Sequence, residues 1–318
     1  MIAVTGAAGF IGSNLAHNLA ALGHELLLVD HPLPATKPAN WAGLNDFRFL
    51  DHERFLAALA NGAVSPEAIF HLGACSSTTE TNWDYLDRNN IAYTRTLWEW
   101  CTHHTRSYLY ASSAATYGDG ALGFDDRTPP EQLQPLNLYG KSKNDFDIWA
   151  LRQKLAPPTW AGLKFFNVYG PREAHKGRMA SVVFQAHKQI LLTGELKLFR
   201  SNDPRFADGG QLRDFVFVRD NVDHMLWLWQ NLHPGGVYNS GTGTARSFYD
   251  LGAAVFRALG KEPNITFIDM PPDLLGKYQN FTEATMAKLR EAGCHHAPTT
   301  LEGGVKQTVD WLEARQKS

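Results

Sequence analysis

The feature that most constrains the fold is a run of three spaced glycines directly after the apolar stretch Ile2–Val4. Gly6, Gly9 and Gly12 follow a Gly-x-x-Gly-x-x-Gly pattern, and apolar residues recur at helical spacing from there to about Ala21. In such a turn the first glycine permits a tight bend, the second lets a diphosphate approach the backbone, and the third lets the helix lie close to the sheet. The N–H groups at the start of the helix supply donors and a partial positive charge. The run therefore predicts a strand, turn and helix that bind the diphosphate of a dinucleotide.

An aspartate and a lysine are relevant to the choice between the dinucleotides NAD and NADP. Asp30 follows Gly12 by eighteen residues, at the end of a second predicted strand, where a carboxylate can accept a hydrogen bond from the adenosine ribose 2′-hydroxyl of NAD. Lys37 lies a few residues further on, in a predicted loop that can fold over the same ribose, and its ammonium group suits the 2′-phosphate of NADP. The residues alone leave NAD and NADP open.

The first half of the chain alternates short apolar runs with amphipathic stretches, which is typical of βαβ units around a parallel sheet. The predicted strands are Ile2–Val4, Glu25–Val29, Ala68–His71, Tyr108–Ala111, Gly162–Phe166 and Phe215–Val218. The predicted later helices are Asn82–Thr102, Leu136–Leu155, Ala180–Leu192, Val222–Asn231 and Gly304–Arg315. We expect an α/β protein with a doubly wound parallel (Rossmann) sheet and a smaller, partly interleaved α/β lobe. The dinucleotide domain is predicted at 1–168, with 211–238 returning to it, and the substrate lobe at 169–210 and 239–318.

Composition excludes several classes of function. Thirty Lys and Arg against 32 Asp and Glu leave a formal charge of −2, so no sequence-wide positive field attracts nucleic acid or an anionic membrane. No apolar run approaches the roughly 18 residues that span a bilayer, and the sequence enters a strand at once, so we expect a cytoplasmic protein. Three scattered cysteines predict reduced thiols. The 13 histidines include two adjacent pairs, whose side chains point to different faces, and we expect no metal site.

A tyrosine and a lysine in the second long predicted helix suggest proton transfer. Tyr139 and Lys143 are four residues apart and therefore lie on one helix face. A neighbouring ammonium stabilises phenolate, so this phenol can take a proton from an alcohol and later return it. Ser113 and Thr116 end the preceding predicted strand, and the carboxyl ends of parallel strands face the ligand crevice. We expect Ser113 to hold the reacting oxygen beside Tyr139.

This combination resembles the extended short-chain dehydrogenase/reductase family, and within it the ADP-L-glycero-D-manno-heptose 6-epimerases. The similar stretches cover nearly the whole chain: Phe70–Thr79, Ala111–Gly118, Asn137–Lys143, Phe166–Gly177, Arg213–Val216, Asn239–Gly243 and Lys277–Thr282. The resemblance implies an isomerase that inverts C6″ of ADP-D-glycero-β-D-manno-heptose through a 6-keto intermediate, for lipopolysaccharide core biosynthesis. It implies one tightly bound NADP per subunit, no nucleic-acid or membrane partner, and a homo-oligomer such as a pentamer.

The resemblance also assigns residues to roles. Lys176 falls at the second catalytic position of these epimerases, as the partner of Tyr139. Lys143 acts on the cofactor, and Ser113 acts on the reacting oxygen. Inversion requires acid–base groups that serve two orientations of the sugar. The cofactor positions are Gly6, Gly9, Phe10, Ile11, Gly12, Asp30, His31, Lys37, His52, Leu72, Gly73, Ala74, Cys75, Ser76, Asn89, Lys143, Val168 and Lys176. The substrate positions are Ser76, Ser113, Asn167, Arg178, Gln185, Phe199, Arg200, Ser201, Asn202, Arg213 and Tyr278.

Two departures and three alternatives accompany this interpretation. Arg178 and Gln185 stand where members carry serine and histidine, and the stretch 200–212 is longer by several residues. A UDP-hexose 4-epimerase uses the same tyrosine, lysine and serine, although the His175-Lys176 segment argues against it. A nonenzymatic NADP-sensing module would need no catalytic tyrosine. A dehydratase is disfavoured because alanines follow Ser113 where dehydratases carry acidic residues.

Overall fold

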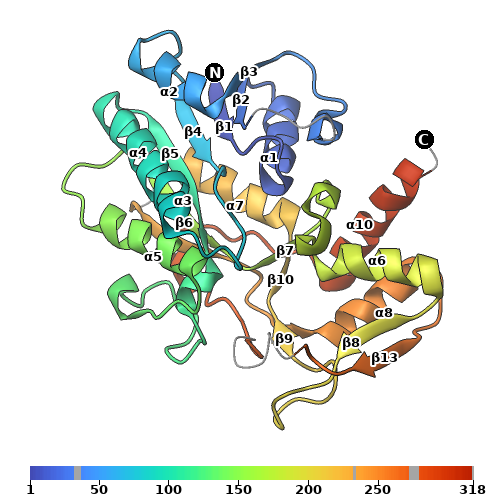
Figure 1. Cartoon of the computed structure of the whole chain (residues 1–318). Coiled ribbons are helices and arrows are strands. Elements are labelled where there is room, and N and C mark those ends of the chain that lie inside the picture. The colour runs from blue at the N-terminus through green and yellow to red at the C-terminus, as the bar shows by residue number, and fades with distance from the viewer. Residues whose placement is uncertain (32–36, 232–233, 272–278, 317–318) are drawn as a thin grey trace.

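The computed structural model describes residues 1–31, 37–231, 234–271 and 279–316, which form a larger and a smaller lobe (Figure 1). The larger lobe contains a seven-stranded parallel sheet in the order β11-β6-β5-β4-β1-β2-β3. Its strands are β1 (Ile2–Thr5), β2 (Leu26–Asp30), β3 (Phe47–Asp51), β4 (Ala68–His71), β5 (Ser107–Ser113), β6 (Trp160–Phe165) and β11 (Gly236–Ser240). The predicted doubly wound parallel sheet is confirmed. The strand order reverses between β1 and β4, which is where such sheets bind ligands.

Helices bury both faces of this sheet. On one face, α1 (Phe10–Ala21) and α7 (Val218–Gln230) pack against Ile2 and Val4. On the other face, α2 (His52–Ala60), α4 (Tyr93–His103) and α5 (Leu138–Leu151) pack against Ala3 and its neighbours. Successive strand residues point to opposite faces, so a strand covered on both sides is apolar throughout. The continuous apolar runs in the sequence follow from this burial.

The smaller lobe is a compact arrangement of three helices and a two-stranded sheet. Helices α6 (Val182–Thr193), α8 (Phe248–Ala258) and α10 (Leu301–Gln316) enclose a core of Val183, Ile190, Leu251 and Val305. Strands β8 (Leu196–Phe199) and β13 (Ile265–Ile268) pair beside them. Short pairs connect the lobes: β7 (Asn167–Tyr169) with β10 (Phe215–Phe217), and β9 (Leu212–Arg213) with β12 (Arg246–Ser247). The domain boundaries at 168 and 238 stay a prediction.

Several elements differ from the sequence-based expectation. Strands β3 and β11 were not predicted, and the strand at 215–217 pairs with β7 rather than entering the large sheet. The expected helix 82–102 is divided into α3 (Trp83–Leu86), a π-helical turn (Asp87–Ala92) and α4. Helix α7 begins four residues before the predicted start, and α5 ends at Leu151, four residues before the predicted end. The short helix α9 (Ala287–Glu291) packs on the larger lobe through Leu289.

Among the described residues, none of the helices has the length and apolar character needed to cross a membrane. Cys75, Cys101 and Cys294 are free thiols.

Candidate active site

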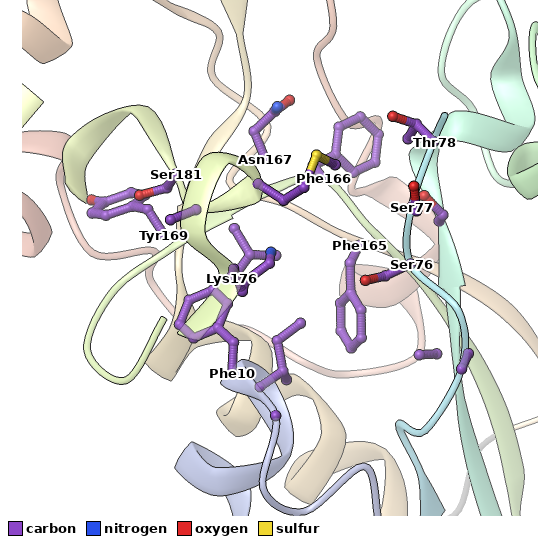
Figure 2. A pocket seen from close by; sticks show the side chains of 18 of the residues that line it. Phe10, Ser76, Ser77, Thr78, Phe165, Phe166, Asn167, Tyr169, Lys176 and Ser181 are labelled. Atoms are coloured by element: carbon purple, nitrogen blue, oxygen red, sulfur yellow. The ribbon is translucent and has the colours of Figure 1, made fainter. Parts of the chain in front are cut away.

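A cavity of about 1160 Å³ lies at the carboxyl ends of β1, β4 and β5 and extends towards the smaller lobe (Figure 2). The predicted positions that line it are Gly6, Gly9, Phe10, Ile11, Gly12, Asp30, His31, His52, Leu72, Gly73, Ala74, Ser76, Asn89, Ser113, Tyr139, Lys143, Asn167, Val168, Lys176, Gln185, Phe199 and Arg213. The structure therefore brings most of the predicted site together, although its segments are spread between Gly6 and Arg213 in the sequence.

The glycine-rich turn has the geometry that its spacing predicts. Gly6 has a φ of 65°, which favours glycine, and a Cβ at Gly12 would lie 2.1 Å from the Gly6 carbonyl oxygen. Gly9 is the N-cap of α1 and offers no side chain to cap it. The first N–H groups of α1 therefore remain available for an anionic group.

Asp30 links the end of β2 to this turn. Its Oδ2 accepts a hydrogen bond from Ala8 N at 2.9 Å, and its Oδ1 accepts one from His31 N at 2.8 Å. The rings of His31 and His52 are 4.2 Å apart at their centroids and form an aromatic wall beside the aspartate. Carboxylate oxygens have further lone pairs, so Asp30 can still accept from a ribose hydroxyl. The side chain of Lys37 lies outside the described part of the structure.

Three catalytic candidates meet at the start of α5. Asn137 caps this helix by accepting a hydrogen bond from Gly140 N at 2.8 Å, which places Tyr139 in the first turn. The side chains of Tyr139 and Ser113 both line the cavity, and Ser113 is close enough to affect the pKa of the Tyr139 phenol. Lys143 follows one turn later, is 6% exposed and donates from Nζ to the Ala111 carbonyl at 2.9 Å. The predicted Ser–Tyr–Lys group is thus assembled on two adjacent elements.

Burial perturbs both titratable groups. Burial raises the pKa of the Tyr139 phenol, and the Ser113 side chain partly offsets the rise. Burial lowers the pKa of the Lys143 ammonium to about 8, although the negative charge of Asp147 opposes the shift. Near neutral pH, the lysine therefore keeps its charge while the phenol keeps its proton.

A buried polar network lies behind α5. Asp147 is fully buried and pairs with Lys164 at 3.1 Å. It also accepts hydrogen bonds from Tyr110 Oη at 2.9 Å and Ser112 Oγ at 2.7 Å. A buried charge with this many partners is held in place. The network anchors α5, and so Tyr139 and Lys143, against β5 and β6.

Asn90, in the π-helical turn, is a site-supporting residue that the sequence did not reveal. Its Oδ1 accepts from Cys75 N at 2.9 Å, while Nδ2 donates to Cys75 O at 3.0 Å and to Ser142 Oγ at 2.9 Å. It joins the loop after β4 to the helix that carries Tyr139. The available signal was an asparagine within an otherwise apolar helix stripe. Cys75 itself takes part through its backbone and does not line the cavity.

Lys176 enters the cavity from the loop after β7, in a short 3₁₀-helical segment (Ala174–Met179). Figure 2 shows its side chain directed into the cavity beside Phe10, with Ser76 on the facing wall. Its Nζ lies 5.5 Å from the centroid of the Phe10 ring. Burial lowers the pKa of Lys176, and the nearby carboxylate of Glu173 opposes that shift. Glu173 is 1% exposed and accepts from Ser181 Oγ at 2.6 Å.

The proposed substrate positions divide into two groups. Arg213 is buried in the lining, where it donates to the carbonyls of Leu212, at 2.9 Å, and Gln279. The Gln185 side chain donates to Gly177 O at 2.6 Å.

The positions outside the cavity lining are Arg178, Arg200, Ser201 and Asn202. Arg200 pairs with Asp208 at 3.0 Å and Asp269 at 3.4 Å. Tyr278 lies outside the described residues, and all these substrate roles stay predictions.

Some lining residues were not among the predicted sites. On the wall after β4 these are Ser77 and Thr78, and on the Lys176 loop they are His175 and Ser181 (Figure 2 labels three of the four). In the smaller lobe they include Gln189, Gln211 and Phe248. Ser77, Thr78 and His175 belong to segments that the resemblance covers, whereas the smaller-lobe residues carry no motif that would have marked them.

Outside the cavity lining, two aspartates and a histidine form a cluster of side chains that commonly bind metal ions. Asp220, Asp223 and His296 bring one potential ligand atom each within 4.8 Å of one another. Asp220 already accepts hydrogen bonds from Thr299 N at 2.9 Å and Thr299 Oγ1 at 2.7 Å. Asp220 therefore joins α7 to the segment before α10, and this structural contact explains why the cluster is present.

Comparisons with known proteins agree with this geometry. Residues 2–241 match the family model described as NAD dependent epimerase/dehydratase family. Over 315 residues the chain is 49% identical to the ADP-L-glycero-D-manno-heptose-6-epimerase of Nitratidesulfovibrio vulgaris, and the match covers 97% of each. The crystal structure of ADP-L-glycero-D-manno-heptose-6-epimerase from Helicobacter pylori is similar with a TM-score of 0.82 and 28% identity, covering 98% of this chain and 96% of the other. UDP-glucose 4-epimerase from Thermotoga maritima, solved with UDP-glucose, is similar with a TM-score of 0.80 and 26% identity, covering 99% of both.

Proposed function

The chain belongs to the NAD dependent epimerase/dehydratase family, and we propose that it inverts C6″ of ADP-D-glycero-β-D-manno-heptose through a 6-keto intermediate, with NADP. The observation that carries the proposal is one cavity lined by Ser113, Tyr139 and Lys143 from β5 and α5 and by Lys176 from a separate loop. The identity to a named heptose epimerase over nearly the full length supports the choice of substrate.

The described residues suit a dinucleotide. The uncapped N–H groups of α1 can bind a diphosphate, Asp30 can accept from the ribose, and Lys143 has two further ammonium hydrogens for the other ribose. Lys37 is proposed for the 2′-phosphate by resemblance alone. When bound, NADP would supply the acceptor and donor of hydride for the sugar carbon.

Side chains of the protein orient the C6″ oxygen and transfer the proton of the C6″ hydroxyl. Ser113, which lines the same cavity as Tyr139, is placed to orient the C6″ oxygen. The Tyr139 phenol first loses its own proton to solvent, and the Lys143 charge stabilises the resulting phenolate. The phenolate then takes the hydroxyl proton as the ketone forms, and the phenol returns it as the alcohol reforms. Lys176 approaches from a different loop and serves the sugar in its second orientation. We do not assign which of Tyr139 and Lys176 acts first.

Arg213 is proposed to bind the diphosphate of the sugar nucleotide. Its guanidinium lines the cavity, and the planar group can form two parallel hydrogen bonds to phosphate oxygens. Arg213→Ala should raise KM for the sugar nucleotide strongly, whereas an unchanged KM would contradict this role.

The deciding experiment has two steps. The purified protein is denatured and the released nucleotide is identified; we expect NADP. The folded protein is then incubated with ADP-D-glycero-D-manno-heptose, and the configuration at C6″ is followed by NMR. Conversion to the L-glycero form supports the proposal, and absence of conversion by protein that retains its nucleotide contradicts it.

The same incubations separate the two alternatives. The structural similarity to a UDP-glucose 4-epimerase favours UDP-hexose as the second candidate substrate. Faster turnover of UDP-glucose than of the ADP-heptose would favour that activity. A transient NADPH absorbance during incubation with the sugar nucleotide would dismiss a nonenzymatic sensor.

The proposal also includes the biological setting. A homo-oligomer in the cytoplasm that supplies lipopolysaccharide core biosynthesis is expected from the resemblance. Light scattering on the purified protein tests the assembly.

A further inference from the structure

Asn40 contacts two parts of the site at once, the glycine-rich turn and the loop that carries Lys176. It lies after β2, in the short 3₁₀-helical segment Lys37–Trp41, and is 7% exposed. Its Nδ2 lies 2.9 Å from Ala8 O, in the glycine-rich turn, 3.1 Å from Arg172 O and 3.1 Å from His175 Nδ1. An amide nitrogen has two hydrogens, so these acceptors share them. The residue after His175 is Lys176.

The segment that carries Asn40 is itself fixed to the dinucleotide motif. Trp41 Nε1 donates to Ala7 O at 2.9 Å, and His17 Nε2 of α1 lies 3.0 Å from Asn40 O. Asn40 therefore presents its amide from a support that does not depend on the Lys176 loop.

A second asparagine holds the beginning of the same loop. Asn14 of α1 donates from Nδ2 to Pro171 O at 2.9 Å and accepts at Oδ1 from the Arg172 guanidinium at 3.1 Å. Arg172 has a φ of 72°, an unfavourable conformation for a residue other than glycine. Such a backbone persists only where surrounding contacts maintain it. Asn14 holds residues 171–172, and Asn40 reaches further, to the residue next to Lys176.

We propose that Asn40 is a positioning residue, which holds the Lys176 amine in the cavity by binding its loop to the glycine-rich turn. The consequence for catalysis rests on the proposed function, whereas the placement of the amine does not. The arrangement makes the Lys176 loop and the diphosphate-binding turn one hydrogen-bonded unit, although they are far apart in the sequence.

The first experiment measures the amine directly. Wild type, Asn40→Ala and Asn40→Asp are pulse-labelled with acetic anhydride at pH 8, and acetylation of Lys176 is measured by mass spectrometry. Asn40→Asp keeps the volume but replaces the donor with a carboxylate. Asn221→Ala is the matched control, because Asn221 is a fully buried amide that donates to Ser240 O at 3.1 Å and does not line the cavity.

We expect the labelling rate of Lys176 to change by about tenfold or more in both Asn40 variants and to stay within about twofold in Asn221→Ala. Circular dichroism identifies any variant that does not fold, and Asn40→Asp tests the hydrogen bonds should Asn40→Ala be too unstable. Wild-type labelling in a folded Asn40 variant would overturn the proposal.

The second experiment separates positioning from general stability. With ADP-heptose as the substrate, Asn40→Ala should lower kcat about 10- to 100-fold while KM changes about twofold. In a Lys176→Met background, Asn40→Ala should cause little further loss, because the group that it positions is gone. Equal losses in both backgrounds would show a merely structural role and overturn the proposal. Should wild type not epimerise the ADP-heptose, the proposed function fails, and the labelling result still decides the role of Asn40.

Discussion

At the scale of single residues, two lysines of the cavity lie in surroundings that disfavour charge, and each is near a carboxylate that favours its charged form. Burial lowers the pKa of both Lys143 and Lys176. Each has a buried carboxylate that opposes the shift: Asp147 one helical turn from Lys143, and Glu173 in the loop beside Lys176. The carboxylates are fixed by their own hydrogen bonds. Both carboxylates therefore favour the charged form of a cavity lysine, although neither carboxylate lines the cavity.

Replacing Tyr139 with phenylalanine removes the proposed proton carrier. Tyr139→Phe should lower kcat by about 10²- to 10⁴-fold, with NADP still bound, because the phenol is not part of the diphosphate site. Steady-state kinetics and the nucleotide content of the purified variant check this. Tyr249→Phe, on the exposed surface of α8, is the control. Turnover within a few-fold of wild type would remove Tyr139 from the mechanism.

The lowered pKa of Lys143 predicts an alkaline limit to activity. The ammonium loses its proton as the pH rises through about 8, so the stabilisation of phenolate is present below that pH and declines above it. An arginine stays charged throughout this range. In Lys143→Arg, kcat is expected to be lower than in wild type, but its descending limb should move to higher pH. Rates between pH 6 and 10 test this, and a limb that stays near pH 8 would assign it to another group.

At the scale of elements, the predictable parts of the site are those set by local chain geometry. The glycine turn and the helix that carries Tyr139 and Lys143 depend on the spacing of a few neighbouring residues, and both were predicted. The π-helical turn was not, because Asn90 occupies a position that suits an ordinary helix stripe and its partners lie on other segments. π-helical turns are often found at functional sites, and this one connects the loop after β4 to α5.

Gly12 tests the close packing of that turn. A Cβ at this position would lie 2.1 Å from the Gly6 carbonyl oxygen, which is backbone and cannot move aside easily. Gly12→Ala should reduce the free energy of unfolding by about 1–3 kcal/mol or more and weaken dinucleotide binding. Urea denaturation and nucleotide titration measure the two effects. In Gly236→Ala, at the start of β11, the nearest atom would be Nζ at the end of the flexible Lys288 side chain, 3.5 Å away, so stability should change little. Similar small effects at both glycines would contradict the packing argument.

At the scale of the whole molecule, the sequence predicts the sheet better than its edges or the smaller lobe. The inner strands are apolar runs, because helices cover both faces. By contrast, β3 lies at the sheet edge and has no fully buried residue, and β11 mixes glycine and polar residues. Neither has the pattern of a buried strand. The Lys176 loop could be placed only by resemblance, since its position depends on asparagines from distant segments.

The whole fold also contains histidines that are buried without charge, which predicts loss of stability in acid. Burial lowers the pKa of His224 to about 4 and that of His71 to about 3, against 6.5 for an exposed histidine. Their contribution to stability is present above pH 6.5 and is lost as the pH falls towards these values, because the unfolded chain binds the protons more readily. From pH 7.5 to pH 4.5 each group should cost roughly 2–3 kcal/mol of the free energy of unfolding.

His224→Gln isolates one of these contributions. The glutamine can still contact Ser240 Oγ, which lies 2.9 Å from His224 Nδ1, but it does not titrate. The variant should be less stable than wild type at pH 7.5, because the buried imidazole packing is lost, yet its further loss between pH 7.5 and pH 4.5 should be smaller by roughly 2 kcal/mol. Urea denaturation at the two pH values measures the difference, with the exposed His295→Gln as control. Equal acid losses in wild type and His224→Gln would mean that His224 is not held neutral in the folded protein.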